Sequence, residues 1–321
     1  MEIKLFAQEV INEAVKLGAS DIFIYPNQEE YQLKFRLPNK LIIFKTVVSK
    51  AGQELINYFK FLADMDIAEH RRPQVGSIAK EKFFLRFSSV GDFSGQESMV
   101  IRLIYVVGSN KYFMKDQLIN LTTHASRRGL ILTSGPTGSG KTSTMYEIAK
   151  EVGKNKVVMT IEDPVEIYEP TFLQTQINLE ANISYESLLK AALRQRPDIL
   201  LVGEIRDSLT ARLAVDAALS GHLVLATLHA KSTLQVISRL QGLGIGQAEL
   251  ANCLTAVSYQ RLIPMKSGEV ACLLDIAAGK RLNSEFETQR HGDFITWTDN
   301  LKFLLKEGII SAADFDRFQE G

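Results

Sequence analysis

A glycine-rich segment near the middle of the chain has the residue types and spacing of a phosphate-binding loop. It fits G-x-x-x-x-G-K-[ST] at every fixed position, between a short apolar run and a predicted helix. Glycines let backbone N–H groups curl round an anion, and the start of a helix adds partial positive charge. We expect Lys141 to reach the β- and γ-phosphates of ATP during catalysis and the Thr142 hydroxyl to hold Mg²⁺. The predicted nucleotide-binding residues are Gly135, Pro136, Thr137, Gly138, Ser139, Gly140, Lys141, Thr142 and Ser143.

An acidic segment follows the next predicted strand, 156–162. Glu162 and Asp163 leave this strand where a bound γ-phosphate would lie, and Pro164 ends the strand. A carboxylate at this place can orient or deprotonate the attacking water, which makes Glu162 a candidate catalytic residue. A solvated acidic loop is the alternative interpretation.

A second acidic segment ends the apolar run 198–202. Gly203 and Glu204 follow that run, which is typical of a Walker B motif, whose carboxylate meets Mg²⁺ or its waters. We expect Glu204 to meet Mg²⁺ through a water, and Gly203 to let the backbone approach closely. The residues leave both Glu162 and Glu204 as candidates for the general base.

Two histidines bracket the predicted strand 223–228. His229, at its carboxyl end, is placed to sense the γ-phosphate and is a candidate catalytic residue, whereas His222 precedes the strand and is a weaker candidate. A histidine at a strand end is more often a structural residue with satisfied hydrogen bonds, and that alternative stays open for both.

Strands and helices alternate around these motifs. Strands are predicted at 129–134, 156–162, 198–202 and 223–228, and helices at 116–127, 141–151, 185–195 and 208–219. The strands are continuous apolar runs, which favours a mostly parallel sheet buried on both faces. Ligands of such sheets gather at the carboxyl ends of the strands, where the motifs lie. The predicted fold class is therefore α/β.

The first third of the chain has a different pattern, with a helix at 3–17 and shorter strands separated by turn residues. We expect a smaller α+β domain over residues 1–107, a linker over 108–115, and the nucleotide-binding domain over 116–321. The tail of that second domain, from residue 232 onward, is expected to be mostly helical, with one apolar run at 270–278.

Charge and cysteine content limit the partners and the cellular location that we expect for the chain. The 321 residues include 37 basic and 37 acidic side chains, so the formal net charge is zero and favours neither nucleic acid nor an anionic membrane as a direct partner. Cys253 and Cys272 lie apart in apolar surroundings, which is typical of buried thiols. The chain shows no signal pattern and no integral membrane segment, so we expect a cytoplasmic protein that reaches the membrane through a partner.

Taken together, these segments resemble the type II/type IV secretion and pilus-assembly ATPases, a branch of the RecA-like hexameric motors. The stretch 193–207 (LRQRPDILLVGEIRD) is similar to the family's signature, 160–166 to its "Asp box" and 221–229 to its "His box". The resemblance covers most of the chain, from 19–22 (ASDI) to 260–263 (QRLI). It implies a RecA-like P-loop ATPase domain that follows a smaller α+β domain, and a homo-oligomeric ring, a hexamer.

The resemblance also implies that the N-terminal domain supplies arginines to the nucleotide site. By motif position these are Arg86 and Arg102, each on a predicted strand in an otherwise apolar stretch. An arginine on the γ-phosphate would stabilise the charge that develops in phosphoryl transfer. The alternative is that both lie at the surface or pair with Glu97 or Asp92.

Two departures from the family pattern point to a subfamily. The four-cysteine zinc module common in secretion members is replaced by 264–268 (PMKSG), and no long extra domain precedes residues 1–19. A short, zinc-free chain is most similar to the competence-pilus assembly ATPases of Gram-positive bacteria, which implies a motor that acts on a membrane platform protein to build a DNA-uptake pseudopilus. The alternatives are a type II secretion or pilus-retraction motor, a nucleic-acid translocase on the same core, and a small-molecule kinase.

Overall fold

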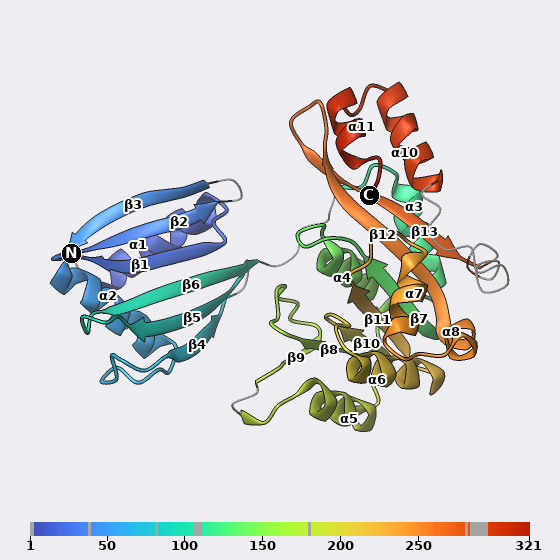
Figure 1. Cartoon of the computed structure of the whole chain (residues 1–321). Helices are drawn as coiled ribbons and strands as arrows, with labels where there is room; N and C mark the ends of the chain where they lie inside the picture. The colour runs from blue at the N-terminus through green and yellow to red at the C-terminus, as the bar shows by residue number, and fades with distance from the viewer. Residues whose placement is uncertain are drawn as a thin grey trace. The chain divides into compact units, whose positions relative to one another are not determined.

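The chain forms two compact units, Met1–Val106 and Val107–Gly321, and each is described by itself (Figure 1). The structure is a computed structural model. It describes residues 3–37, 40–80, 83–105, 111–178, 181–279, 282 and 295–321.

The first unit is a six-stranded sheet in the order β3-β2-β1-β6-β5-β4, with every neighbouring pair antiparallel. Its elements are α1 (Ile3–Lys16), β1 (Asp21–Asn27), β2 (Glu30–Leu37), β3 (Lys40–Val48), α2 (Ser49–Leu62), β4 (Gln74–Ala79), β5 (Phe83–Gly91) and β6 (Glu97–Tyr105). Alternate strand residues pack with α1 and α2 into one core, so one face of the sheet is buried. The predicted α+β architecture is confirmed.

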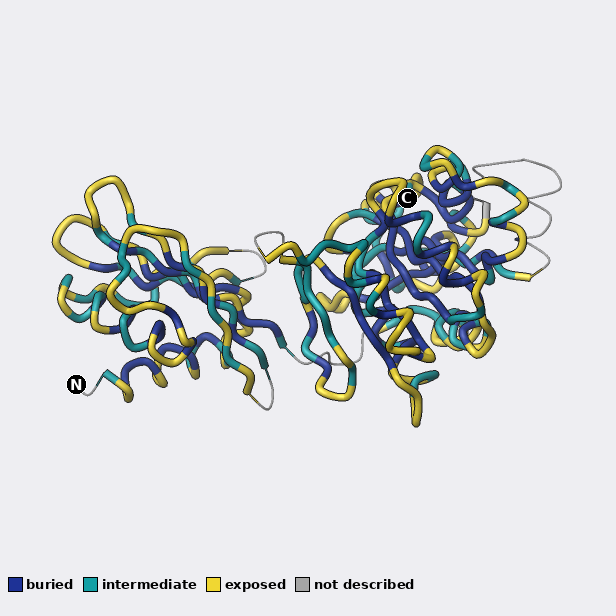
Figure 2. The backbone as a smooth tube through the Cα atoms, turned by 90° about the horizontal axis from the view of Figure 1, so that it is seen from below, coloured by how far each residue is buried: buried dark blue, intermediate teal, exposed yellow. Residues whose placement is uncertain are grey.

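The second unit contains a seven-stranded sheet in the order β13-β12-β7-β11-β10-β8-β9. Its strands are β7 (Gly129–Ser134), β8 (Val158–Glu162), β9 (Leu173–Gln176), β10 (Ile199–Val202), β11 (Leu223–Leu228), β12 (Leu254–Pro264) and β13 (Val270–Ala278). All pairs are parallel except β12–β13. Every residue of β7, β8, β10 and β11 is buried, as their continuous apolar runs predict (Figure 2).

Helices cover both faces of this sheet. They are α3 (Lys115–His124), α4 (Lys141–Val152), α5 (Tyr185–Gln195), α6 (Ser208–Leu219), α7 (Gln235–Gly242), α8 (Gln247–Cys253), α10 (Ile295–Lys306) and α11 (Ala312–Phe318). The core on one face includes side chains of α3 and α4, and the core on the other includes side chains of α5 to α8. The α/β prediction is confirmed. Because helices pack on both faces of the sheet, the strands are held in place and so are the motifs at their ends.

The expectation of a mostly helical tail is wrong for residues 254–264, which form a strand, and the apolar run at 270–278 is a second strand. These residues form the hairpin β12–β13, which extends the sheet beside β7, and α10 and α11 pack on that hairpin. Because β12 is buried along most of its length, its sequence lacks the polar alternation of a half-exposed strand.

The predicted linker over 108–115 also needs correction. Residues 108–110 lie outside the described part of the chain, but Phe113 N–H donates to the Cys272 carbonyl at 3.0 Å and Cys272 N–H donates to Lys111 O at 2.7 Å. Residues 111–113 therefore belong to the edge of the second unit's sheet, and α3 begins at Lys115.

The cysteines behave as the sequence predicts. Cys253 and Cys272 are buried free thiols, and burial raises their pKa to about 11 and about 12. Among the residues that the structure describes, no three or more His, Cys, Asp or Glu side chains cluster in a way that could hold a metal ion. In the same part of the chain, no helix is long and apolar enough to cross a bilayer.

Candidate active site

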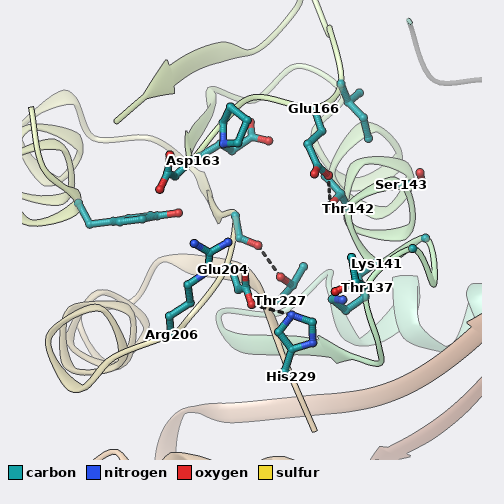
Figure 3. A pocket seen from close by; sticks show the side chains of 17 residues that line it. Thr137, Lys141, Thr142, Ser143, Asp163, Glu166, Glu204, Arg206, Thr227 and His229 are labelled. Carbon is teal, nitrogen blue, oxygen red and sulfur yellow. Dashed lines mark hydrogen bonds and ion pairs between the residues drawn. The ribbon is translucent and has the colours of Figure 1, made fainter. Parts of the chain in front are cut away.

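The predicted motifs meet in one cavity of about 540 Å³ at the carboxyl ends of β7, β8, β10 and β11 (Figure 3). These strands are neighbours in the sheet and run parallel, so their ends lie along one edge. The lining residues are Thr137, Gly138, Gly140, Lys141, Thr142, Ser143, Glu162, Asp163, Pro164, Glu166, Ile167, Tyr185, Gly203, Glu204, Arg206, Thr227 and His229.

The glycine-rich loop connects β7 to α4 with a backbone that glycine favours. Gly138 and Gly140 have φ of 75° and 82°, in the left-handed region, and α4 starts at the next residue, Lys141. Left-handed positions within a tight loop turn successive N–H groups toward one centre, where the helix N-terminus adds positive potential. At the first position of the loop, Gly135 packs closely against β12, because a Cβ there would lie 2.5 Å from Gln260 O. The loop is therefore shaped for an anion.

Lys141 is held against this loop. Its Nζ donates to the carbonyls of Gly135 at 3.0 Å and Pro136 at 2.9 Å. Burial lowers the pKa of this amine, while Glu204 and Glu166 oppose the shift. A bound phosphate would give the amine an anionic partner in place of two neutral carbonyls.

Oxygen donors suited to a hard divalent cation lie beside Lys141. Thr142 Oγ1 donates to Glu166 Oε2 at 3.0 Å at the start of α4, and Glu204 lines the same cavity (Figure 3). Hydroxyl and carboxylate oxygens are the ligands that Mg²⁺ takes up, usually with retained waters and phosphate oxygens. The donor set therefore fits the predicted metal.

Glu204 lies between two basic side chains. Its Oε2 is 2.6 Å from Arg206 Nε, and its Oε1 is 2.9 Å from His229 Nε2. The other ring nitrogen of His229 is 3.1 Å from Gly135 O. Each ring nitrogen of His229 is therefore within hydrogen-bond distance of an oxygen, one on the carboxylate and one on the loop backbone. His229 thus joins Glu204 to the glycine-rich loop.

Glu162 has a different environment, because its side chain is almost wholly buried. The residue is 1% exposed, and its Oε1 accepts from Tyr146 Oη at 2.6 Å and Thr160 Oγ1 at 2.7 Å. Burial raises the pKa of Glu162 although these donors oppose the shift. A Cβ on Gly203 would lie 3.3 Å from Glu162 Cα, so the predicted close approach of the backbone at this glycine is confirmed.

Three predicted residues of the glycine-rich loop and His222 do not line this cavity. Gly135 and Pro136 border a second cavity of about 490 Å³ that shares His229, and Ser139 is buried. His222 is at the amino end of β11, where Nδ1 lies 3.1 Å from Ala217 O. The structure therefore brings His229, and not His222, to the cavity.

The two candidate arginines lie in the first unit. Arg86 on β5 and Arg102 on β6 are register partners, and the residues that flank them point into the core, so both face outward. Arg102 Nε is 3.0 Å from Asp21 Oδ1. The carboxylate that pairs with Arg102 is thus Asp21, and not Glu97 or Asp92.

Several lining residues had no predicted role. Asp163, Glu166 and Arg206 stand within four residues of Glu162 or Glu204, and this proximity is a signal that the sequence does contain. Thr227 donates to the Gly203 carbonyl and so fixes the backbone before Glu204, but a buried threonine in an apolar strand gives no signal. Tyr185, the first residue of α5, also lines the cavity. Its place there depends on the path of the chain between β9 and α5, which the sequence does not show.

A P-loop, two acidic strand ends and a strand-end histidine at the carboxyl edge of a mostly parallel sheet define an ATPase of RecA-like fold. The chain belongs to the type II/IV secretion system protein family, whose model matches residues 1–290.

Competence proteins are among the similar chains. Competence protein ComGA of Streptococcus pneumoniae is 39% identical over 314 residues, which cover 97% of this chain and 96% of that protein. ComGA of Bacillus subtilis is 37% identical over 274 residues, covering 82% and 77%. The chain is thus a ComGA-like secretion and pilus ATPase.

Solved structures share the fold. The pilus retraction motor PilT with bound ADP has a TM-score of 0.75 at 25% identity, over 96% of this chain and 95% of that one. The ATPase DotB of Legionella pneumophila has a TM-score of 0.70 at 20% identity, over 97% and 94%. The PilT likeness agrees with the predicted RecA-like fold and ATPase activity.

Proposed function

We propose that this chain is the cytoplasmic ATPase motor that powers assembly of a competence pseudopilus for DNA uptake. The observation that carries the ATPase part is the convergence of the phosphate-binding loop, Glu204 and His229 on one cavity. The competence part is supported by the ComGA relatives, which match nearly the full chain in one case.

The chemistry follows from the side chains at the cavity. ATP phosphates would lie on the N–H groups of the loop, with Lys141 on the β- and γ-phosphates. Thr142 and, through a water, Glu204 would hold Mg²⁺, which when bound neutralises charge on the phosphate oxygens. Glu162 would position the attacking water, and His229 would respond to the γ-phosphate because it already contacts both Glu204 and the loop.

The motor step needs contacts that differ between the ATP and ADP states. We propose that Arg86 and Arg102, from the first unit of the same or a neighbouring subunit, clamp the phosphates and let go after hydrolysis. A homo-oligomeric ring, a hexamer, would pass this motion to a membrane platform protein. The chain would contact that protein and not nucleic acid, in keeping with its zero net charge.

The nucleotide site has a direct test. Lys141→Ala removes the amine that neutralises the β- and γ-phosphates, so MgATP affinity should fall at least about 100-fold and turnover should be lost. Lys150→Ala, on the same helix and paired with Glu169, is the matched control and should leave both unchanged. Normal turnover in Lys141→Ala would reject the site.

The biological role is tested by deleting the gene and scoring surface filaments and uptake of added DNA. Loss of both is the expected result, and loss of neither would contradict the competence proposal.

The likeness to PilT favours a retraction motor as the second candidate. Deletion of a retraction motor would leave surface filaments, and DNA-stimulated hydrolysis by the purified chain would point to a translocase.

A further inference from the structure

A buried glutamine on β12 contacts the back of the phosphate-binding loop. Gln260 is 0% exposed, and its Nε2 donates to Ser139 O at 2.6 Å. A carbonyl oxygen can only accept, so the amide nitrogen must be the atom that faces Ser139. The stretch 260–263 has no role in the mechanism proposed above.

This hydrogen bond sets the direction of one peptide group in the loop. In a planar trans peptide the C=O and the following N–H point in opposite directions. With the Ser139 carbonyl held toward β12, the N–H of Gly140 is turned the other way, and Gly140 lines the cavity. We propose that Gln260 is a positioning residue that presets the loop backbone for phosphate binding. This inference rests on the proposed nucleotide site.

Stability alone does not account for an amide at this place. Gln260 Oε1 and Ser139 Oγ are both buried, and neither has a hydrogen-bond partner among the described residues. An unpartnered buried polar atom destabilises a fold, so the unpartnered Gln260 Oε1 offsets part of the stability that its Nε2 provides by satisfying the Ser139 carbonyl. The benefit of the amide is the orientation of the Ser139–Gly140 peptide.

The strand that carries Gln260 is fixed on several sides. Ser134 Oγ donates to Ser258 O at 2.8 Å, and Ser258 Oγ is 3.1 Å from Thr133 Oγ1, so β12 is bound to the strand that enters the loop. The ring of Tyr259 packs edge-on against Trp297 of α10, with centroids 5.2 Å apart. Gln260 therefore acts from a rigid support, as precise positioning requires.

Gln260→Met in the full chain tests the proposal, because methionine keeps the length and removes the donor. We expect the Kd for MgADP and the KM for ATP to rise about tenfold, with kcat within about twofold of the unsubstituted chain and a Tm lower by a few degrees, because the buried Ser139 carbonyl loses its donor. Thr255→Val is the matched control, because its hydroxyl donates from the same strand to Arg128 O at the far end of β7. An unchanged Kd in folded Gln260→Met would overturn the proposal, as would a fall in kcat at constant KM.

Gln260→Glu gives an independent readout if the methionine variant fails to fold. A protonated glutamic acid can donate to the Ser139 carbonyl, whereas an ionised one repels both that oxygen and the phosphates. MgADP affinity relative to the unsubstituted chain should therefore improve as pH falls, and a ratio that does not vary with pH would contradict the proposal. If Gln260→Met and Gln260→Glu leave nucleotide affinity unchanged while Lys141→Ala abolishes it, the nucleotide site stands and this inference alone fails.

Discussion

The two units of the chain use charged side chains in opposite ways. In the parallel sheet, Lys141, Glu204 and His229 stand at strand or helix ends around a cavity. In the first unit, one ion pair is wholly buried: Lys60 Nζ of α2 lies 2.8 Å from Glu97 Oε1 of β6, with side chains 0% and 1% exposed. Arg86 and Arg102 occupy the middle of strands on the outward face of its antiparallel sheet. Parallel strands bring their ends to one edge, whereas antiparallel strands bring residues together by register.

The comparison predicts that charges of the second unit act mainly on turnover and buried charges of the first unit mainly on stability. The largest effect is expected for Glu204→Gln, which keeps the shape but removes the carboxylate that would meet the metal's water. Turnover should fall about 1000-fold while MgATP affinity changes by less than about fivefold. Steady-state ATPase assays and equilibrium nucleotide binding measure the two. Glu249→Gln, which removes the charge of an ion pair on α8, is the control. An equal loss of turnover in both variants would contradict a specific role of Glu204 in turnover.

Lys60→Met should act on stability. It leaves Glu97 buried without its ammonium partner, so the free energy of unfolding should fall by about 3 kcal/mol, measured by urea denaturation of the full chain. Lys45→Met, which breaks an exposed pair with Glu9 at 3.4 Å, should cost less than about 1 kcal/mol. Equal losses in the two variants would show that the buried pair adds nothing beyond a surface pair.

Glu162→Gln should separate function from stability within the second unit. The variant should lose turnover if Glu162 positions the water, yet unfold at a higher temperature at neutral pH, with a gain of about 1 kcal/mol. The reason is that burial raises the pKa of Glu162, so holding it ionised in the folded chain destabilises the fold.

The pH dependence fixes the sign of this effect. Below the ordinary pKa of a glutamate the carboxyl is protonated in both folded and unfolded chains, so the variant gains nothing there. As pH rises through the raised pKa of the folded state, the unsubstituted chain loses stability relative to the variant. Thermal melts across the acid-to-neutral range check this, and an advantage that grows toward low pH would contradict it.

The sequence predicted the parts of the site that depend on strand ends and local motifs. The P-loop, Glu204 and His229 follow apolar runs whose burial is evident from composition, and the structure places all of them at one cavity. Strand β12 and the role of Gln260 could not be predicted in this way. A strand buried on both faces resembles a buried helix, and contact with Ser139 depends on a sheet neighbour more than a hundred residues away.

The proposed completion of the nucleotide site by arginines from the first unit is the step on which the motor depends. Its most direct test is the ATPase rate of assembled rings in which Arg86 and Arg102 are both replaced by alanine. Arg36→Ala is the control, because Arg36 lies across from Asp21 on the same face, 3.9 Å from its carboxylate. We expect the ATPase rate of the double variant to fall about 100-fold or more, with MgADP affinity largely retained. Undiminished turnover by assembled rings of the double variant would contradict it.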